Sequence, residues 1–281
     1  MTRLARRVRR LLAATAGVGL TATAAVGITA PTAAAAPLPN SMAALGDSIT
    51  MGFNTCGWFR DCPKNSWSTG DNTEVNSHYL RIRAKNPAIA GKAYNNGKSG
   101  AEVSALVDQA KKAVSQRVEY VTILIGANDA CADTESQMTS VSDFEQRFRA
   151  AMGTLRDGLS SPSVQVSSVP DLKRLWQVLK DDPDARGTWS FGKICQTMLA
   201  NPTSTAAADV ARRDRVRQRV ADYNGVLSRV CGEFAGCRFD GNAVFDYPFL
   251  PKHVTTWDYF HPNTKGEAVL AEQTYRATFD W

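Results

Sequence analysis

The stretch Ser41-Met42-Ala43-Ala44-Leu45-Gly46-Asp47-Ser48-Ile49-Thr50 decides the fold, because an apolar run ends there in a turn that carries a serine. A short apolar run closed by a glycine predicts a buried strand, here over residues 41–46. Runs of the same kind predict strands over residues 92–95, 120–126, 164–169 and 237–240. Segments of helical length separate them, and this alternation is typical of a parallel sheet covered by helices. The sequence therefore predicts an α/β fold with a mostly parallel, five-stranded sheet.

Four segments have the periodicity of helices. In residues 101–117, one face carries the apolar side chains Val103, Leu106, Val107, Ala110 and Val114. Ser142-Asp143-Phe144-Glu145 has the form of a capping box, which predicts a helix that starts there. Residues 206–230 predict a long helix, and residues 265–278 predict a final one after Thr264-Lys265-Gly266-Glu267.

Residues 1–36 have the pattern of a secretory signal peptide. A cationic start and an apolar middle lead to Ala33-Ala34-Ala35-Ala36-Pro37, which predicts cleavage after Ala35 or Ala36. A membrane anchor is the alternative, but the apolar segment is at the short limit for crossing a bilayer. The pairs Arg6-Arg7 and Arg9-Arg10 leave both the Sec and the Tat export routes open. We therefore expect a secreted protein.

The charge of the remaining chain argues against a nucleic-acid partner. The predicted signal peptide holds five arginines and no acids, so its removal lowers the formal net charge from +6 to +1. No Lys/Arg stripe with interleaved aromatic residues is left to bind nucleic acid. Residues 37–281 suit one core, and no linker or repeat divides them, so we expect a single domain. We also expect a monomer.

Six cysteines, an even number in a chain predicted to be exported, indicate three disulfides rather than a metal site. Six cysteines allow fifteen pairings. Short local loops favour Cys56 with Cys62 and Cys231 with Cys237, which leaves Cys131 for Cys195.

Three polar segments directly follow predicted strands. They are Gly46-Asp47-Ser48, Asn95-Asn96-Gly97-Lys98-Ser99-Gly100 and Gly126-Ala127-Asn128-Asp129. In a parallel sheet the carboxyl ends of the strands lie at one edge, where chemistry gathers. Gly97-Lys98-Ser99 resembles the end of a phosphate-binding loop, but Gly91 lies one residue too far upstream for that motif. We expect a site at this edge that needs no cofactor and no metal.

A serine hydroxyl is a poor nucleophile until an imidazole takes its proton, and the imidazole needs a carboxylate to fix its tautomer. Asp258 and His261 are three residues apart, and Pro262 disfavours a helix at His261, so both are predicted on one loop. Ser48, His261 and Asp258 are therefore the candidate catalytic residues. The alternative is a surface loop whose histidine packs beside aromatic side chains.

Acyl transfer also needs hydrogen-bond donors aimed at the oxyanion that develops in the transition state. Three donors are candidates: the backbone N–H groups of Ser48 and Gly100 and the side-chain amide of Asn128.

These segments resemble the four conserved blocks of the GDSL-type esterases and lipases in the SGNH hydrolase family, in its secreted, actinobacterial-type branch. The blocks read Gly46-Asp47-Ser48-Ile49, Asn95-x-Gly97-x-Ser99-Gly100-Ala101, Gly126-x-Asn128-Asp129 and Asp258-x-x-His261-Pro262, in the family's order. Ile49 stands where the family name has leucine, and Gly97 stands where alanine is frequent.

The resemblance implies a flavodoxin-like, three-layer α/β/α sandwich. It implies that Ser48 is the nucleophile, His261 the general base and Asp258 its orienting carboxylate. Ser48, Gly100 and Asn128 would then be the oxyanion donors. It also supports the three sequential disulfides.

We therefore expect a secreted serine esterase or lipase that acts on lipid or acyl esters, including phospholipids. A carbohydrate acetyl esterase and a non-catalytic secreted binding module are the alternatives. Trp58 and Phe59, on a loop pinned by cysteines, are expected to contact the acyl chain or, transiently, a lipid surface. Trp176 is expected on the opposite wall of the site, and His253 is expected to line it.

Overall fold

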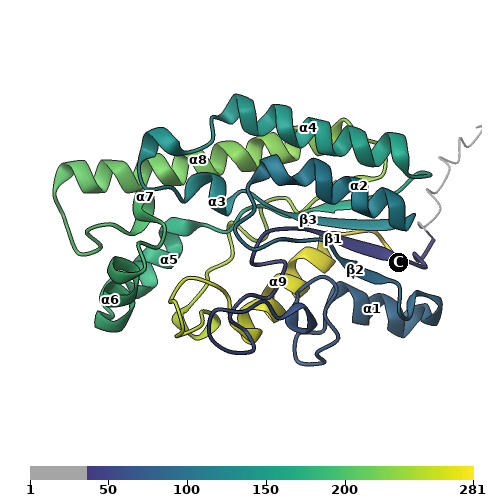
Figure 1. Ribbon diagram of the computed structural model, residues 1–281, viewed down its shortest axis with the longest axis horizontal. Coiled ribbons are helices and arrows are strands. Elements are labelled where there is room, and N and C mark those ends of the chain that lie inside the picture. Colours follow the sequence, from purple (N-terminus) through teal and green to yellow (C-terminus); the bar gives the residue numbers. More distant parts are fainter. Residues whose placement is uncertain (1–36) are drawn as a thin grey trace, which may run out of the picture. The chain divides into compact units, whose positions relative to one another are not determined.

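Five parallel strands form the central sheet of the protein, in a computed structural model that describes residues 37–281. The strands are β1 (Met42–Gly46), β2 (Ala93–Asn95), β3 (Tyr120–Leu124), β4 (Ser163–Val166) and β5 (Cys237–Phe239). Their order in the sheet is β2-β1-β3-β4-β5 (Figure 1). Met42 lies opposite Ala93 on one side and Tyr120 on the other. The predicted α/β class with a five-stranded parallel sheet is confirmed, and the order is that of the flavodoxin-like folds.

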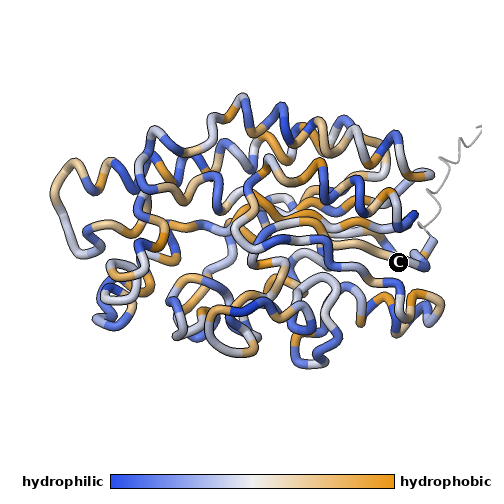
Figure 2. The backbone as a smooth tube through the Cα atoms, in the orientation of Figure 1, coloured by the Kyte–Doolittle hydropathy of each residue, from blue (hydrophilic) through white to orange (hydrophobic). Residues whose placement is uncertain are grey.

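Helices cover both faces of the sheet. One face carries α2 (Leu106–Gln116), α4 (Val141–Gly158) and α8 (Ala207–Gly232), and the other carries α1 (His78–Lys85) and α9 (Thr264–Arg276) (Figure 1). Both faces of β3 are therefore buried: Val121 and Ile123 lie in the core under α2, α4 and α8, and Leu124 packs with Leu270 of α9. This explains why the strands read as unbroken apolar runs, visible along the sheet in Figure 2.

Short helices lie beyond the carboxyl ends of the strands. They are α3 (Ala127–Ala130), α5 (Leu172–Leu179), α6 (Pro183–Phe191) and α7 (Gln196–Leu199). Helices α5, α6 and α7 lie at the left of Figure 1. Single 3-10 turns occur at Pro63–Asn65, Pro87–Ile89, Val103–Ala105, Glu135–Gln137 and Pro251–His253. None of α5, α6 and α7 was expected from the sequence.

Three predicted helix starts are wrong. The helix expected from residue 101 begins at Leu106, because the Val103 N–H donates to Asp129 Oδ2 (2.9 Å) and the chain there forms a 3-10 turn. Helix α4 is capped by Ser140 rather than Ser142, since Ser140 Oγ accepts the Asp143 N–H (3.1 Å). Helix α9 is capped by Asn263, whose side chain accepts two backbone N–H groups of the first turn.

The six cysteines form the three expected pairs: Cys56–Cys62, Cys131–Cys195 and Cys231–Cys237. The signal peptide predicted for residues 1–36 lies outside the described residues. From residue 37 onward, no helix has both the length and the apolar character needed to cross a membrane.

Candidate active site

The turn that carries Ser48 is held by contacts on both sides of β1. A Cβ added to Gly46 would lie 2.3 Å from the Leu124 carbonyl oxygen of β3, so only glycine fits at the end of the strand. The Gln109 side chain of α2 accepts the Gly46 N–H (2.7 Å) and donates to the Gly46 carbonyl (2.9 Å). Asp47 Oδ1 accepts the Ile49 N–H (2.9 Å). These bonds fix the backbone on either side of Ser48.

Ser48, His261 and Asp258 form one chain of hydrogen bonds. Ser48 Oγ lies 2.7 Å from His261 Nε2, and His261 Nδ1 lies 2.6 Å from Asp258 Oδ2. The two ends of this chain are 213 residues apart in the sequence. The carboxyl ends of the strands bring together the three residues that were selected from local motifs.

The ionisation state of Asp258 determines which nitrogen of His261 carries a hydrogen. Burial by itself would raise the pKa of Asp258, but the hydrogen bond and charge of His261, with two backbone N–H groups, lower the pKa below its ordinary 3.8. The ionised carboxylate only accepts hydrogen bonds, so His261 Nδ1 carries the hydrogen. His261 Nε2 is then the acceptor for the Ser48 hydroxyl. This is the tautomer that a general base requires.

Asn54 also contacts the Asp258 carboxylate, which was not foreseen. Its side-chain amide Nδ2 lies 2.5 Å from Asp258 Oδ2, across 204 residues of sequence. No local sequence pattern marks Asn54 or Gln109, because each acts on a partner that only the fold brings near.

The three expected oxyanion donors lie on segments that are hydrogen-bonded to one another. The Lys98 N–H donates to the Gly46 carbonyl (3.1 Å), and Asn128 Nδ2 donates one hydrogen to the Ala101 carbonyl (2.9 Å). The second amide hydrogen of Asn128 is not used by that bond. Within residues 37–281, the Ser48 and Gly100 N–H groups donate no hydrogen bond. Gly100 has a φ of 78°, which glycine adopts without strain.

Three carboxyl groups are buried behind the nucleophile. Burial raises the pKa of Asp47 to about 7, against the opposing effects of the Ile49 N–H and the charge of His261. Burial also raises the pKa of Asp129 to about 6 and the pKa of Glu267 well above 4.5. Burial thus disfavours the charged form of each of these three groups, whereas the pKa of Asp258 is lowered, so Asp258 is the carboxylate best placed to balance a positive charge on His261.

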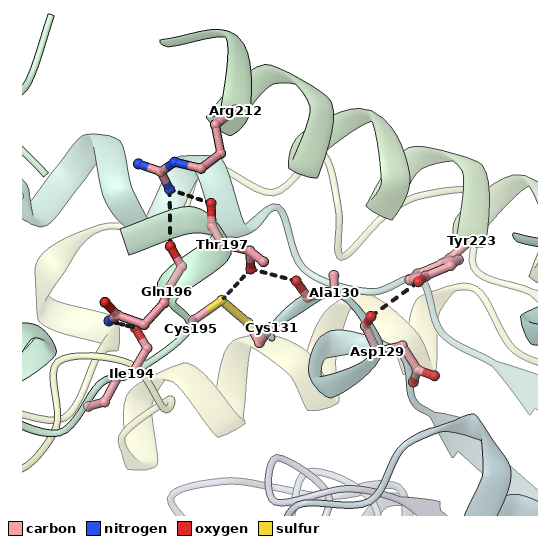
Figure 3. Close-up of a disulfide and its surroundings, with 9 residues drawn as sticks. All are labelled: Asp129, Ala130, Cys131, Ile194, Cys195, Gln196, Thr197, Arg212 and Tyr223. Carbon is pink, nitrogen blue, oxygen red and sulfur yellow. Dashed lines mark hydrogen bonds between the residues drawn. A yellow bond between two sulfur atoms is a disulfide. The ribbon is translucent and has the colours of Figure 1, made fainter. Parts of the chain in front are cut away.

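Helix α3, which carries Asn128, is anchored from behind (Figure 3). The disulfide Cys131–Cys195 joins its end to the segment before α7. Thr197 Oγ1 donates to the Ala130 carbonyl (2.6 Å), and the Tyr223 hydroxyl of α8 lies between the Thr139 carbonyl, its closer partner, and the Asp129 carbonyl (3.2 Å) (Figure 3). The disulfide and these hydrogen bonds therefore hold in place the short helix that carries Asn128.

Two cavities meet at His261. The first, which we call the apolar slot, contains Ser48 and Asn128 and is lined by Leu172, Leu175, Phe249, Val254, Phe260 and others. The second, which we call the aromatic groove, contains Asn54 and Asp258 and is lined by Phe53, Trp58, Phe59, Phe191, Trp257 and others. Within residues 37–281, no group of three His, Cys, Asp or Glu side chains is arranged to hold a metal ion.

The residues expected to contact substrate divide between these cavities. Trp58 and Phe59 line the aromatic groove and are 67% and 74% exposed, and His253 lines the apolar slot. Phe191 and Trp257 also line the groove and were missed, because nothing local relates them to Trp58.

Trp176 was expected on the opposite wall of the site, but it lines neither cavity. Its indole N–H donates to the Pro202 carbonyl (2.8 Å), and the Arg213 guanidinium lies 4.4 Å from its ring centroid. Leu172 and Leu175 of the same helix face the slot instead. Helix α5 was not predicted from the sequence, so the side of that helix that faces the site could not be determined.

Comparison with known proteins identifies the family to which the chain is similar. A family model described as "GDSL-like Lipase/Acylhydrolase" matches residues 42–274. No curated protein matches the chain.

Several solved structures are similar to the chain. LAE5, described as an alpha/beta hydrolase enzyme from the metagenome of Lake Arreo, Spain, is 18% identical with a TM-score of 0.53, over 84% of this chain and 94% of that one. An extracellular lipase from Streptomyces rimosus is 16% identical with a TM-score of 0.47, over 85% and 99% of the two chains. A GDSL-like lipase from Parabacteroides merdae is 18% identical with a TM-score of 0.49, over 85% and 94%. The likeness to LAE5 shows a shared fold.

Proposed function

The chain belongs to the GDSL-like lipase/acylhydrolase family and is an ester hydrolase, and we propose that it hydrolyses carboxylic esters with Ser48, His261 and Asp258 as its catalytic triad. The observation that carries this proposal is the unbroken chain of short contacts, 2.7 Å from Ser48 Oγ to His261 Nε2 and 2.6 Å from His261 Nδ1 to Asp258 Oδ2.

In the first half of the reaction, Ser48 Oγ attacks the ester carbonyl carbon while His261 Nε2 takes the hydroxyl proton. The carbonyl oxygen becomes an oxyanion, held by the Ser48 and Gly100 N–H groups and the free amide hydrogen of Asn128. Losing one such donor costs about a hundredfold to a thousandfold in rate. The tetrahedral intermediate collapses as His261 gives the proton to the leaving oxygen, and the alcohol departs.

In the second half, water attacks the acyl group on Ser48. His261 Nε2 takes a proton from the attacking water. The bond between Ser48 Oγ and the acyl carbon then breaks, His261 returns the proton to Ser48 Oγ, and the carboxylic acid is released. Asp258 stays ionised throughout and stabilises the imidazolium in both halves.

The two cavities suggest where each part of the ester lies. His261 lines both cavities, but Ser48 lines only the apolar slot, so we assign the acyl part that bonds to Ser48 to the slot and the alcohol part to the aromatic groove. The first carbons of the acyl chain then lie in the apolar slot beside Ser48, between Leu172, Leu175 and Phe249, and a longer chain continues beyond this slot of about 60 Å³. Apolar walls favour a hydrocarbon chain there, because each buried methylene contributes about 0.8 kcal/mol.

The aromatic groove supports a lipid-like substrate over a glycan. A glycan needs many polar partners for its hydroxyls, whereas most residues that line the groove are apolar, and two of its polar residues, Asn54 and Asp258, are already hydrogen-bonded to each other (2.5 Å). Trp58, Phe59, Phe191 and Trp257 are 67%, 74%, 95% and 52% exposed around its rim. Exposed aromatic side chains that gather at one site mark a contact surface, here with a lipid aggregate, transiently.

An ester panel of increasing acyl length tests this proposal. Wild type should hydrolyse medium and long acyl esters, and Ser48→Ala should abolish turnover. Leu175→Trp, which fills the slot, should lower kcat/KM for long acyl chains more than for acetate. Trp176→Ala on the same helix is the matched control and should leave the profile unchanged.

The rim has its own test. The double variant Trp58→Ala/Phe59→Ala should weaken hydrolysis of long-chain esters, which form aggregates, more than that of soluble short-chain esters, because the exposed rim is the part proposed to contact the aggregate. An equal loss for both would count against substrate contact by this loop. A sharp acetate preference of the wild type, together with activity on acetylated glycans, would favour the carbohydrate acetyl esterase. A folded protein without any ester turnover would favour the binding module.

Export is part of the proposal. Three disulfides are typical of proteins that fold in an oxidising compartment. Sequencing the amino terminus of the protein recovered from culture medium should give a start at Ala36 or Pro37. Recovery of an uncleaved, membrane-bound chain would contradict secretion.

A further inference from the structure

The Asp258 carboxylate has every acceptor position filled. Oδ1 accepts the backbone N–H groups of Phe260 (2.8 Å) and His261 (2.9 Å). Oδ2 contacts His261 Nδ1 (2.6 Å) and Asn54 Nδ2 (2.5 Å). Since a carboxylate offers about four lone-pair positions, Asn54 supplies the last of them. It is also the one partner in this set that comes from outside the Asp258–His261 loop.

The orientation of the Asn54 amide is fixed by a second contact. The Phe59 backbone N–H, which can only donate, lies 2.6 Å from Asn54 Oδ1. The atom that faces it must be the oxygen, so the NH2 group is the one that faces Asp258. One side chain thus joins the Asp258 carboxylate to the backbone beside the exposed Phe59.

Asn54 also suits its backbone position. Its φ is 62°, in the left-handed region where asparagine is one of the few tolerated side chains besides glycine. Its N–H donates to the Arg60 carbonyl (2.9 Å), and its side chain is buried. The loop that it closes carries Trp58 and Phe59 and is cross-linked by Cys56–Cys62.

We propose that Asn54 is a positioning residue that holds the Asp258 carboxylate in the orientation that His261 requires and ties it to the aromatic loop of residues 53–60. This inference rests on the proposed function. Asn54 acts through Asp258: its amide keeps Oδ2 directed at His261 Nδ1, so the imidazole stays aligned with Ser48 Oγ. A misplaced catalytic group costs up to about a hundredfold in rate.

Two variants separate the roles of Asn54. Asn54→Gly keeps the left-handed backbone and removes both side-chain hydrogen bonds. Asn54→Asp tolerates the same backbone and keeps an acceptor for the Phe59 N–H, but it replaces the donor to Asp258 with a second carboxyl group.

Asn65→Ala is the matched control. Asn65 is buried against the same loop, where its amide donates to Thr55 Oγ1 (3.1 Å) and its Oδ1 accepts Asn72 Nδ2 (2.8 Å). The substitution loosens the loop without touching Asp258.

The measurement is kcat and KM for a soluble ester across pH, per active site counted with a fluorophosphonate, together with the thermal transition. Asn54→Gly should lower kcat by about tenfold to a hundredfold, the effect of losing a hydrogen bond to a charged group, with KM little changed. In Asn54→Asp the acid midpoint of the kcat/KM profile should differ from that of wild type, because two carboxyl groups this close share a proton and so change the charge beside the imidazole. Two ionisable groups of the described residues interact with the charge of His261, Asp258 on its own loop and Asp47 after β1, and neither is changed.

Asn65→Ala should lower the melting temperature while kcat and the acid midpoint stay at their wild-type values. The inference is overturned if both Asn54 variants keep the wild-type kcat and the wild-type acid midpoint of the kcat/KM profile. It is also overturned if Asn65→Ala lowers kcat as much as the Asn54 variants do while Asn54→Asp leaves the acid midpoint unchanged. Failure of the proposed function is a separate result: wild type itself would then behave like Ser48→Ala.

Discussion

The carboxylate of Asp258 sets the tautomer of His261, so it is the residue at which the chemistry is most sensitive to a change of one atom. Asp258→Asn places a neutral amide next to His261 Nδ1, which lies 2.6 Å from the carboxylate oxygen in the wild type. The imidazole then has no reason to keep its hydrogen on Nδ1 and no counter-charge when it is protonated. We predict that kcat falls by roughly ten-thousandfold while KM changes little.

Steady-state kinetics on a soluble ester, with circular dichroism to verify folding, measures this prediction. A loss of less than about tenfold in folded protein would mean that another group orients His261.

Individual elements are where sequence and structure differ most, and helix α4 allows a direct test. Ser140 Oγ accepts the Asp143 N–H (3.1 Å), whereas the expected cap was Ser142. Ser140→Ala should lower the free energy of unfolding by about 1 kcal/mol, the value of an N-cap, and Ser142→Ala should lower it by much less. Urea unfolding of the two variants decides between them, and a larger loss in Ser142→Ala would reverse the assignment.

The same helix shows why boundaries could not be predicted while the strands could. Ser142 was selected from the sequence because Ser142-x-x-Glu145 matches a capping box, whereas in the structure Ser140, two residues earlier, accepts the Asp143 N–H. Strand β3 offers no such choice, because Tyr120 to Leu124 are apolar or fully buried on both faces. Local pattern decides an element when burial is two-sided and leaves its ends open when several caps compete.

Residues of the site follow the same division. Ser48, Asp258 and His261 stand in local motifs and were selected by sequence. Asn54 meets Asp258 across 204 residues, and no spacing could reveal that contact. Trp176 was wrongly placed because the phase of α5 relative to the site depends on packing, which sequence does not state.

Across the whole molecule, the disulfides stabilise the fold unequally. Cys131–Cys195 closes a separation of 64 residues, and Cys231–Cys237 closes one of 6. Because the loss of chain entropy grows with the closed loop, replacing the first pair by alanine should cost about 4 kcal/mol and the second about 2 kcal/mol. Urea unfolding of the two double variants compares them. An equal or larger loss at Cys231–Cys237 would contradict this order.

Buried carboxyl groups give the molecule a pH dependence of known sign. Glu267 is fully buried, and burial raises its pKa well above 4.5. Above about pH 4.5 the unfolded chain loses the Glu267 proton while the folded protein keeps it. The free energy of unfolding therefore falls as the pH rises from about 4.5 toward the raised pKa of the folded state. The slope is about 1.4 kcal/mol per pH unit until the folded pKa is reached.

Glu267→Gln removes that slope, and the oxygen of the new side-chain amide can still accept the Trp67 N–H that Glu267 accepts (2.8 Å). The variant should therefore gain stability relative to wild type as pH rises from about 5 to about 7. Urea unfolding at both pH values measures the gain. Glu272→Gln on the exposed side of α9 is the control. Parallel pH profiles for wild type and Glu267→Gln would contradict the prediction.

The contact between Ser48 and His261 is tested most directly by covalent labelling. Wild type treated with a fluorophosphonate and digested for mass spectrometry should carry one phosphonyl group, on Ser48. Ser48→Ala should carry none, and His261→Ala should react far more slowly. A phosphonyl group on another residue, or ester hydrolysis that persists in Ser48→Ala, would contradict the account.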